Sequence, residues 1–149
     1  MELRGNRDIA ASRGQVIRAL RDPEMIRAIL PEIVAFTPTG PESYDLALQV
    51  KAGPVPIRLS GNYRLTGPAE KGAPLHLALE LNGPLGASVA ITLTLGIKQQ
   101  SPYLTHFVHR GALVAGGILG KFAEEQKARV EAALNRRLDD FARQVERAA

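Results

Sequence analysis

The centre of the chain alternates apolar and polar residues with a period of two, and this pattern restricts the possible folds more than any other feature. Residues 44–51, 57–65, 75–82 and 88–98 each show the alternation. It is typical of β-strands that bury one face and expose the other. Because strands joined by short turns pair as an antiparallel meander, we expect a sheet with one apolar face. The turns are the breaks rich in glycine and proline, at Gly53-Pro54, Gly67-Pro68, Gly72 to Pro74 and Gly83-Pro84.

Helical segments are expected on both sides of this meander. After a first strand at residues 2–9, Ser12 and Gln15 form a capping-box pattern, and Asp22-Pro23 starts a second short helix. From Leu119 onward, apolar residues recur at helical spacing, which predicts one amphipathic helix of about 28 residues. The inner face of the sheet is the only large apolar surface that this helix could cover.

Residues 103–112 are expected to form the last strand, and two phases fit the pattern. Leu104 and Val108 favour one face toward the helix, whereas Phe107 favours the opposite face. In the first phase His106 points into the space beneath the helix, and in the second it is exposed.

Composition argues against several kinds of site. The chain has no cysteine, which excludes thiol catalysis, disulfides and thiolate-bound metals. His106 and His109 lie three apart in a strand and point to opposite faces, so we expect no metal site and no other cofactor. The net charge of +4 comes from 19 basic and 15 acidic residues spread along the chain, and aromatic residues make up 5%. Nucleic-acid binding is not expected, because it needs basic groups gathered on one face.

The longest stretch without polar side chains, Gly111 to Gly120, is half as long as a helical membrane span. We therefore expect a cytoplasmic protein that touches a membrane only from one side. Two interpretations of this glycine-rich segment are open. It is either a flexible apolar entrance that contacts a bilayer, or the close packing of a helix start against the sheet.

Several short patterns occur in an order that is found in one family. They cover nearly the whole chain: Asp22-Pro23-Glu24, Leu30-Pro31, Lys51-x-Gly53-Pro54-Val55 leading into Ser60-Gly61, the Gly83 to Ala87 turn, and the small residues before the last helix. In these features the chain resembles the START-like (SRPBCC) superfamily of helix-grip proteins, and within it the CoxG family, which is named for a subunit of carbon monoxide dehydrogenase. It departs from the family pattern at Glu32 and Pro56, where glycine is usual.

The resemblance implies a single START-like domain over residues 1–149 with an α+β helix-grip fold. A curved antiparallel sheet of about seven strands would wrap around a long C-terminal helix, with two short helices after the first strand. It also implies a cavity between sheet and helix for an apolar, lipid- or quinone-like small molecule. Through the family's link to membrane-associated carbon monoxide oxidation, it further implies an oxidoreductase partner.

We expect the ligand-binding walls to come from both the strands and the last helix. The hydroxyls of Tyr44 and Tyr63 either orient a ligand carbonyl or belong to plain core packing, and Gln126 binds either a ligand head group or a strand. The inward leucines and isoleucines also have the bulk to fill the space. The candidate residues are Tyr44, Leu48, Leu59, Tyr63, Leu79, Ile91, Leu93, Phe122, Gln126 and Val130, with His106 in the first strand phase.

No nucleophile with an adjacent base and no close carboxylate pair stands out, so no catalytic residue is assigned. The expected function is a non-enzymatic binding or carrier protein. One alternative is a small cyclase-type enzyme that uses His106 or a tyrosine as its acid–base group. Another is an accessory protein for assembly of an oxidoreductase, which would expose an apolar patch around Val114 to Leu119.

Overall fold

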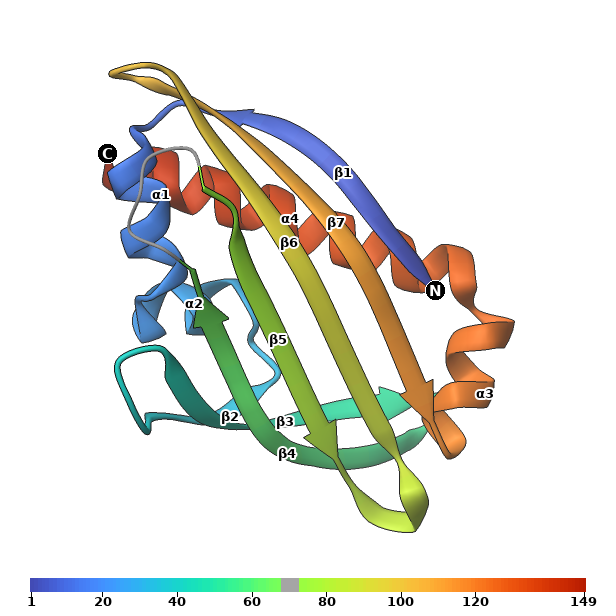
Figure 1. Ribbon diagram of the computed structural model, residues 1–149. Coiled ribbons are helices and arrows are strands. Elements are labelled where there is room, and N and C mark those ends of the chain that lie inside the picture. The colour runs from blue at the N-terminus through green and yellow to red at the C-terminus, as the bar shows by residue number, and fades with distance from the viewer. Residues whose placement is uncertain (68–72) are drawn as a thin grey trace.

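The computed structural model describes residues 1–67 and 73–149 as one seven-stranded antiparallel sheet with helices on its inner side (Figure 1). The strand order is β1-β7-β6-β5-β4-β3-β2, so the first strand lies beside the last. The strands are β1 (Glu2–Ile9), β2 (Ile33–Pro38), β3 (Ser43–Ala52), β4 (Val55–Thr66), β5 (Leu75–Asn82), β6 (Ser88–Ser101) and β7 (Leu104–Gly116). The helices are α1 (Arg13–Leu20), α2 (Pro23–Ile29), the short 3-10 turn η1 (Pro84–Gly86), α3 (Ile118–Glu125) and α4 (Lys127–Ala148).

This architecture confirms the α+β helix-grip fold. The predicted turn from Gly67-Pro68 to Pro74 falls largely on residues 68–72, which lie outside the described residues.

The strand register places the inward residues in continuous rows across the sheet. One row runs from Tyr44 through Tyr63, Leu79 and Ile91 to Leu113, one residue from each of β3 to β7. Because strand side chains alternate between faces, these residues all point toward the helices. The predicted period-two pattern therefore marks the concave face correctly.

Glycines in two strands allow the sheet to curve. A Cβ atom placed on Gly61 would lie 1.8 Å from the carbonyl oxygen of Glu80, and one on Gly111 would lie 1.8 Å from that of Thr92. A side chain at either position would force the neighbouring strand away. The close approach of the backbones bends β4 and β7, so that the sheet wraps around α4 (Figure 1).

The first two helices begin where the sequence predicts. Ser12 and Gln15 form the capping box of α1, and the Asp22 side chain accepts a hydrogen bond from the Glu24 amide at the start of α2. Helix α1 packs against β6 and β7, and α2 packs against β2 and α4. Together they close one end of the concave face.

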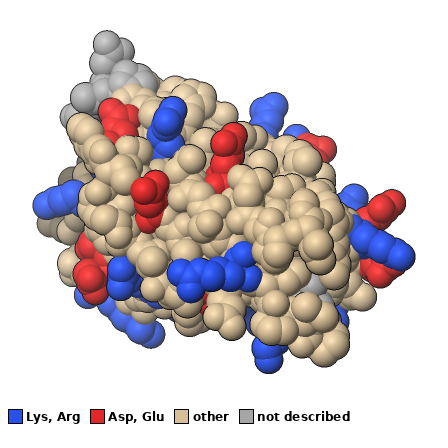
Figure 2. All heavy atoms as spheres, turned by 90° about the horizontal axis from the view of Figure 1, so that it is seen from below, with Lys and Arg blue, Asp and Glu red and all other residues tan. Residues whose placement is uncertain are grey.

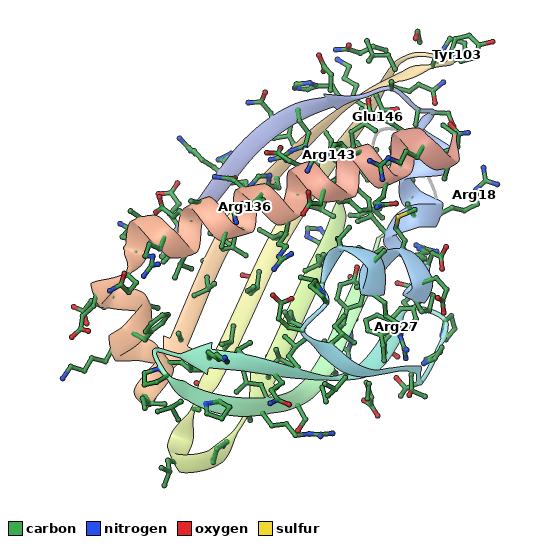
Figure 3. All side chains as sticks on the ribbon, turned by 180° about the vertical axis from the view of Figure 1, so that it is seen from behind. Arg18, Arg27, Tyr103, Arg136, Arg143 and Glu146 are labelled. Atoms are coloured by element: carbon green, nitrogen blue, oxygen red, sulfur yellow. The ribbon has the colours of Figure 1, made fainter. Side chains whose placement is uncertain are left out.

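The long C-terminal helix is confirmed, but it begins at Lys127 and not at Leu119, because the chain breaks at Gln126. This residue has φ −115° and ψ 30°, which ends α3 and starts α4 in a new direction. Helix α4 is buried only in its second half, through Phe141, Ala142 and Val145. Arg136 and Arg143 lie on its exposed face (Figure 3).

The structure shows which residues of β7 point inward, a question that the sequence pattern left open. Thr105 and Phe107 are buried on the inner face, and the strand continues to Gly116 before Gly117 turns the chain with a φ of +62°. The segment Gly111 to Gly120 is therefore a strand end, a turn and the first residues of α3. Its Leu113 and Leu119 are buried.

We predict that Gly61→Ala destabilises the protein by about 1–3 kcal/mol, because the added methyl group overlaps the backbone of β5. Gly96→Ala is the matched control, since a Cβ there would lie 3.7 Å from the Val108 Cβ, an ordinary contact. Urea unfolding of both variants measures the difference. Equal unfolding midpoints for the two would contradict this explanation of the curvature.

Candidate functional site

A cavity of about 680 Å³ lies between the concave face of the sheet and the helices. Its walls come from all seven strands, from α1 and α2, and from α3 and α4. The inward leucines Leu48, Leu77, Leu79 and Leu93 line it, and they are only half-buried. The leucines therefore do not fill the space beneath the helix, which excludes the interpretation of a solid core there.

The opening of the cavity lies between edge strand β1 and the first half of α4. Exposed lining residues mark it: Glu2 and Arg4 on β1, and Lys127 and Asn135 on α4. The charges there have both signs. Figure 2 likewise shows Lys and Arg interspersed with Asp and Glu on the face that it presents, without a patch of one sign.

The structure brings most of the strand candidates together. The lining residues among them are Leu48, Leu59, Tyr63, Leu79, Ile91 and Leu93. Tyr44 is buried on the same face but is not part of the lining. Phe122, Gln126 and Val130 are not part of it either. The break at Gln126 separates α3 from α4, so the single helical face on which these three residues were expected to lie does not form.

His106 points away from the cavity, so its placement beneath the helix is wrong. Its Nδ1 lies 2.8 Å from Oδ1 of Asp8, the residue opposite it on β1. The inner face is taken by its neighbours, since the Thr105 hydroxyl donates to the Ala11 carbonyl at 2.7 Å and Phe107 packs against Phe141.

The two buried tyrosines hold the end of α1. The Tyr44 hydroxyl donates to the Arg21 carbonyl at 2.7 Å, and the Tyr63 hydroxyl donates to the Leu20 carbonyl at 3.2 Å. These carbonyls belong to the last turn of a helix, where no helical amide is available to them. Burial, together with the nearby Tyr44, raises the pKa of Tyr63 well above its ordinary value, although Arg21 opposes this shift. Tyr63 is therefore a neutral hydrogen-bond donor.

His109 is the cavity residue that the sequence pattern did not single out. It is 3% exposed, lines the cavity and lies opposite Gly5 of β1. A Cβ on Gly5 would lie 2.6 Å from the imidazole Cε1, so the glycine makes room for the ring. Burial and the charge of Arg7 lower the pKa of His109, which is neutral at pH 7. Its position follows from β7, because it lies two residues after the inward Phe107.

Ion pairs fix α4 over the cavity. Arg137 of α4 lines the cavity and donates to Glu32 Oε1 at 2.6 Å and to the Ile29 carbonyl at 3.3 Å. On the other side, Arg7 of β1 pairs with Asp139. Helix α4 is thus tied to β1 on one side and to the connection between α2 and β2 on the other.

The described chain holds neither a cluster of metal ligands nor a membrane-spanning helix. In residues 1–67 and 73–149, no group of three or more His, Cys, Asp or Glu side chains is placed to hold a metal ion. Within the same residues, no helix has the length and apolarity that crossing a membrane requires.

The curved sheet, the crossing helix and the cavity between them define a START-like helix-grip protein. The chain belongs to the CoxG family of carbon monoxide dehydrogenase subunits, whose model matches residues 5–148. No curated protein sequence matches the chain significantly.

Solved structures share the fold at low sequence identity. A conserved protein from Geobacillus kaustophilus is 11% identical, with a TM-score of 0.81 over 99% of this chain and 97% of the other. The Zhui aromatase/cyclase from Streptomyces sp. R1128 is 18% identical, with a TM-score of 0.67 over 99% and 94%. A protein from Rhizobium leguminosarum is 16% identical, with a TM-score of 0.66 over 99% and 95%. These similarities establish the fold alone.

We predict that Tyr44→Phe lowers the free energy of unfolding by about 1–2 kcal/mol, because the Arg21 carbonyl loses its hydrogen-bond donor. Tyr103→Phe is the control, since the Tyr103 side chain is exposed at the β6–β7 turn. Chemical denaturation followed by circular dichroism measures both. An unchanged stability of Tyr44→Phe would show that the contact with α1 contributes little.

Proposed function

We propose that this chain is a non-enzymatic carrier that holds an apolar, lipid- or quinone-like small molecule in the cavity between its sheet and α4. The observation that carries the proposal is the unfilled apolar cavity. Its volume of about 680 Å³ lies within the usual range of small-molecule sites. Membership of the CoxG family, which is named for a subunit of carbon monoxide dehydrogenase, supports a role beside an oxidoreductase of that kind.

The chemistry of the walls favours a ligand that is mostly hydrocarbon. Leu, Ile and Val side chains from six strands form the inner surface, and Leu134 and Leu138 face them from α4. The charged lining residues are Glu2 and Arg4 on β1, Lys127 and Glu131 on α4, and Arg137, which is paired with Glu32. An extended apolar molecule would therefore lie along the leucines with its polar end toward β1 and α4.

The cyclase alternative is less well supported, although an aromatase/cyclase shares the fold. Its candidate acid–base groups are engaged elsewhere. Both tyrosine hydroxyls donate to carbonyls of α1, and His106 lies on the outer face beside Asp8. A carrier needs only the shape and apolarity of the cavity.

We predict that the purified protein carries an extractable isoprenoid or acyl compound, and that Leu93→Trp reduces its yield about tenfold or more, because the indole occupies ligand space. Thr94→Trp is the control, since Thr94 is the next residue on β6 and faces outward. Native mass spectrometry and solvent extraction measure the bound compound. A wild-type protein that carries none, and that added quinones and lipids do not stabilise, would overturn the carrier proposal.

We also propose that the end of the molecule formed by η1 and the start of α3 touches a bilayer from its cytoplasmic face. Leu85 is 94% exposed and adopts a positive φ of 57°, an unfavourable backbone conformation for leucine. Gly117, at the start of α3, approaches the backbone of Gly86. Val114 and Ile118, 65% and 45% exposed, add to the apolar surface at this end.

Exposed lysines on adjoining elements favour a bilayer over a protein partner. Lys51 lies near the end of β3, which packs against α3, and Lys121 lies on α3 itself. Glu124 and Glu125 are also exposed, but they lie at the far end of α3, and apolar side chains beside lysines suit a surface that contains anionic lipid. The segment Gly111 to Gly120 would then bring the cavity close to the lipid that it loads.

We predict that Leu85→Ser slows uptake of a prenylated quinone from vesicles of phosphatidylcholine and phosphatidylglycerol about tenfold, while detergent-solubilised quinone still binds normally. Tyr103→Ser is the control, because Tyr103 is an exposed aromatic at the other end of β6. Stopped-flow fluorescence measures uptake. Equal rates for Leu85→Ser and wild type would place membrane contact, or docking on a partner enzyme, on another surface.

A further inference from the structure

His109 is a polar side chain in the apolar strand wall of the cavity, away from the charged residues at the opening. Unlike Tyr63 and Arg137, it forms no hydrogen bond that holds a helix in the described chain. His109 lines the cavity, and its Nδ1 is buried. Among residues 1–67 and 73–149, no group forms a hydrogen bond with that atom. Leaving a buried polar atom without a partner is costly, and such atoms in native proteins usually have a binding role or a bridging water. Nε of Arg7 is a second buried atom that lacks a partner in the described chain.

We propose that His109 is the polar anchor of the cavity, where its imidazole hydrogen-bonds an uncharged or anionic oxygen in the head group of the apolar ligand. The inference rests on the proposed carrier function and names the head-group chemistry that the carrier selects. A neutral imidazole offers one N–H donor and one acceptor nitrogen, which suits a carbonyl or hydroxyl oxygen.

The position of His109 fits a head group rather than a hydrocarbon tail. The residue lies opposite Gly5 on β1, and β1 borders the opening. Leu95, its neighbour on β6, is buried, so polar contacts concentrate on the β1 side. A ligand oriented with its oxygen toward β1 would place its tail along Leu79 and Leu93.

Arg7 adds selectivity for charge. Its charge is close enough to His109 to act on the imidazole electrostatically. Arg7 does not itself line the cavity, so its positive charge acts on a head group only at a distance, where it disfavours an ammonium group. Arg7 pairs with Asp139 through its Nη1, and this pairing does not use the buried Nε.

The experiment compares two probes of the same shape on the full chain. One is a geranyl-substituted 1,4-naphthoquinone, and the other is the corresponding naphthalene without carbonyl oxygens. We expect His109→Leu to weaken binding of the quinone about tenfold and to leave binding of the naphthalene unchanged or tighter. His109→Gln, which keeps a donor and an acceptor, should recover most of the quinone affinity. His106→Leu is the control, because it removes a histidine from the outer face of the same strand.

The imidazole ¹⁵N signals of His109 provide a readout that a merely structural role would not move. They should shift when the quinone is added to the wild type and remain in place with the naphthalene. A wild-type quinone affinity in a folded His109→Leu, or ¹⁵N signals that respond equally to both probes, would overturn the anchor while leaving the carrier intact. A wild-type protein that binds neither probe would overturn both the anchor and the proposed function.

Discussion

The structure depends on a mismatch of areas, because one helix cannot cover the concave face of a seven-stranded sheet. Helix α4 buries Phe141, Ala142 and Val145 against the sheet, but its first half stands off from the central strands. The leucines beneath that half keep partly accessible surface, which in an ordinary core would be filled by side chains. An apolar cavity is the consequence of this geometry.

Two sets of polar contacts prevent the cavity from collapsing. Tyr44 and Tyr63 fix the end of α1 to the sheet, and the pairs of Arg137 with Glu32 and of Arg7 with Asp139 fix α4 at both flanks. Each contact joins a helix to a part of the chain that is distant in sequence. The helices are therefore held at a distance that side-chain packing alone would not maintain, so the site is formed before a ligand arrives.

Much of the fold could be predicted from local patterns, and the site only in part. Alternation predicted β3 to β6 and the inward direction of Leu48, Leu79 and Leu93, because a period of two fixes the face. The family resemblance supplied the cavity. Two features could be recognised only in the folded structure. The phase of β7 depended on the pairing of Asp8 with His106 across strands, and the break at Gln126 had no glycine or proline to signal it. The sequence pattern did not predict strand β2, because its alternation is short and is interrupted by a bulge between Ile33 and Ala35.

The phase of β7 has the largest chemical consequence, because it decides which histidine the cavity contains. A shift of β7 by one residue would turn His106 inward and leave Asp8 on the outer face of β1, so the two side chains would no longer pair. The observed phase leaves that pair at the surface and places a neutral imidazole inside, in space that Gly5 provides. A neutral ring with unused hydrogen-bonding capacity is tolerable in an apolar cavity and becomes favourable when an oxygen reaches it. The register of one strand thus sets both the stability of the wall and the kind of molecule that the wall can recognise.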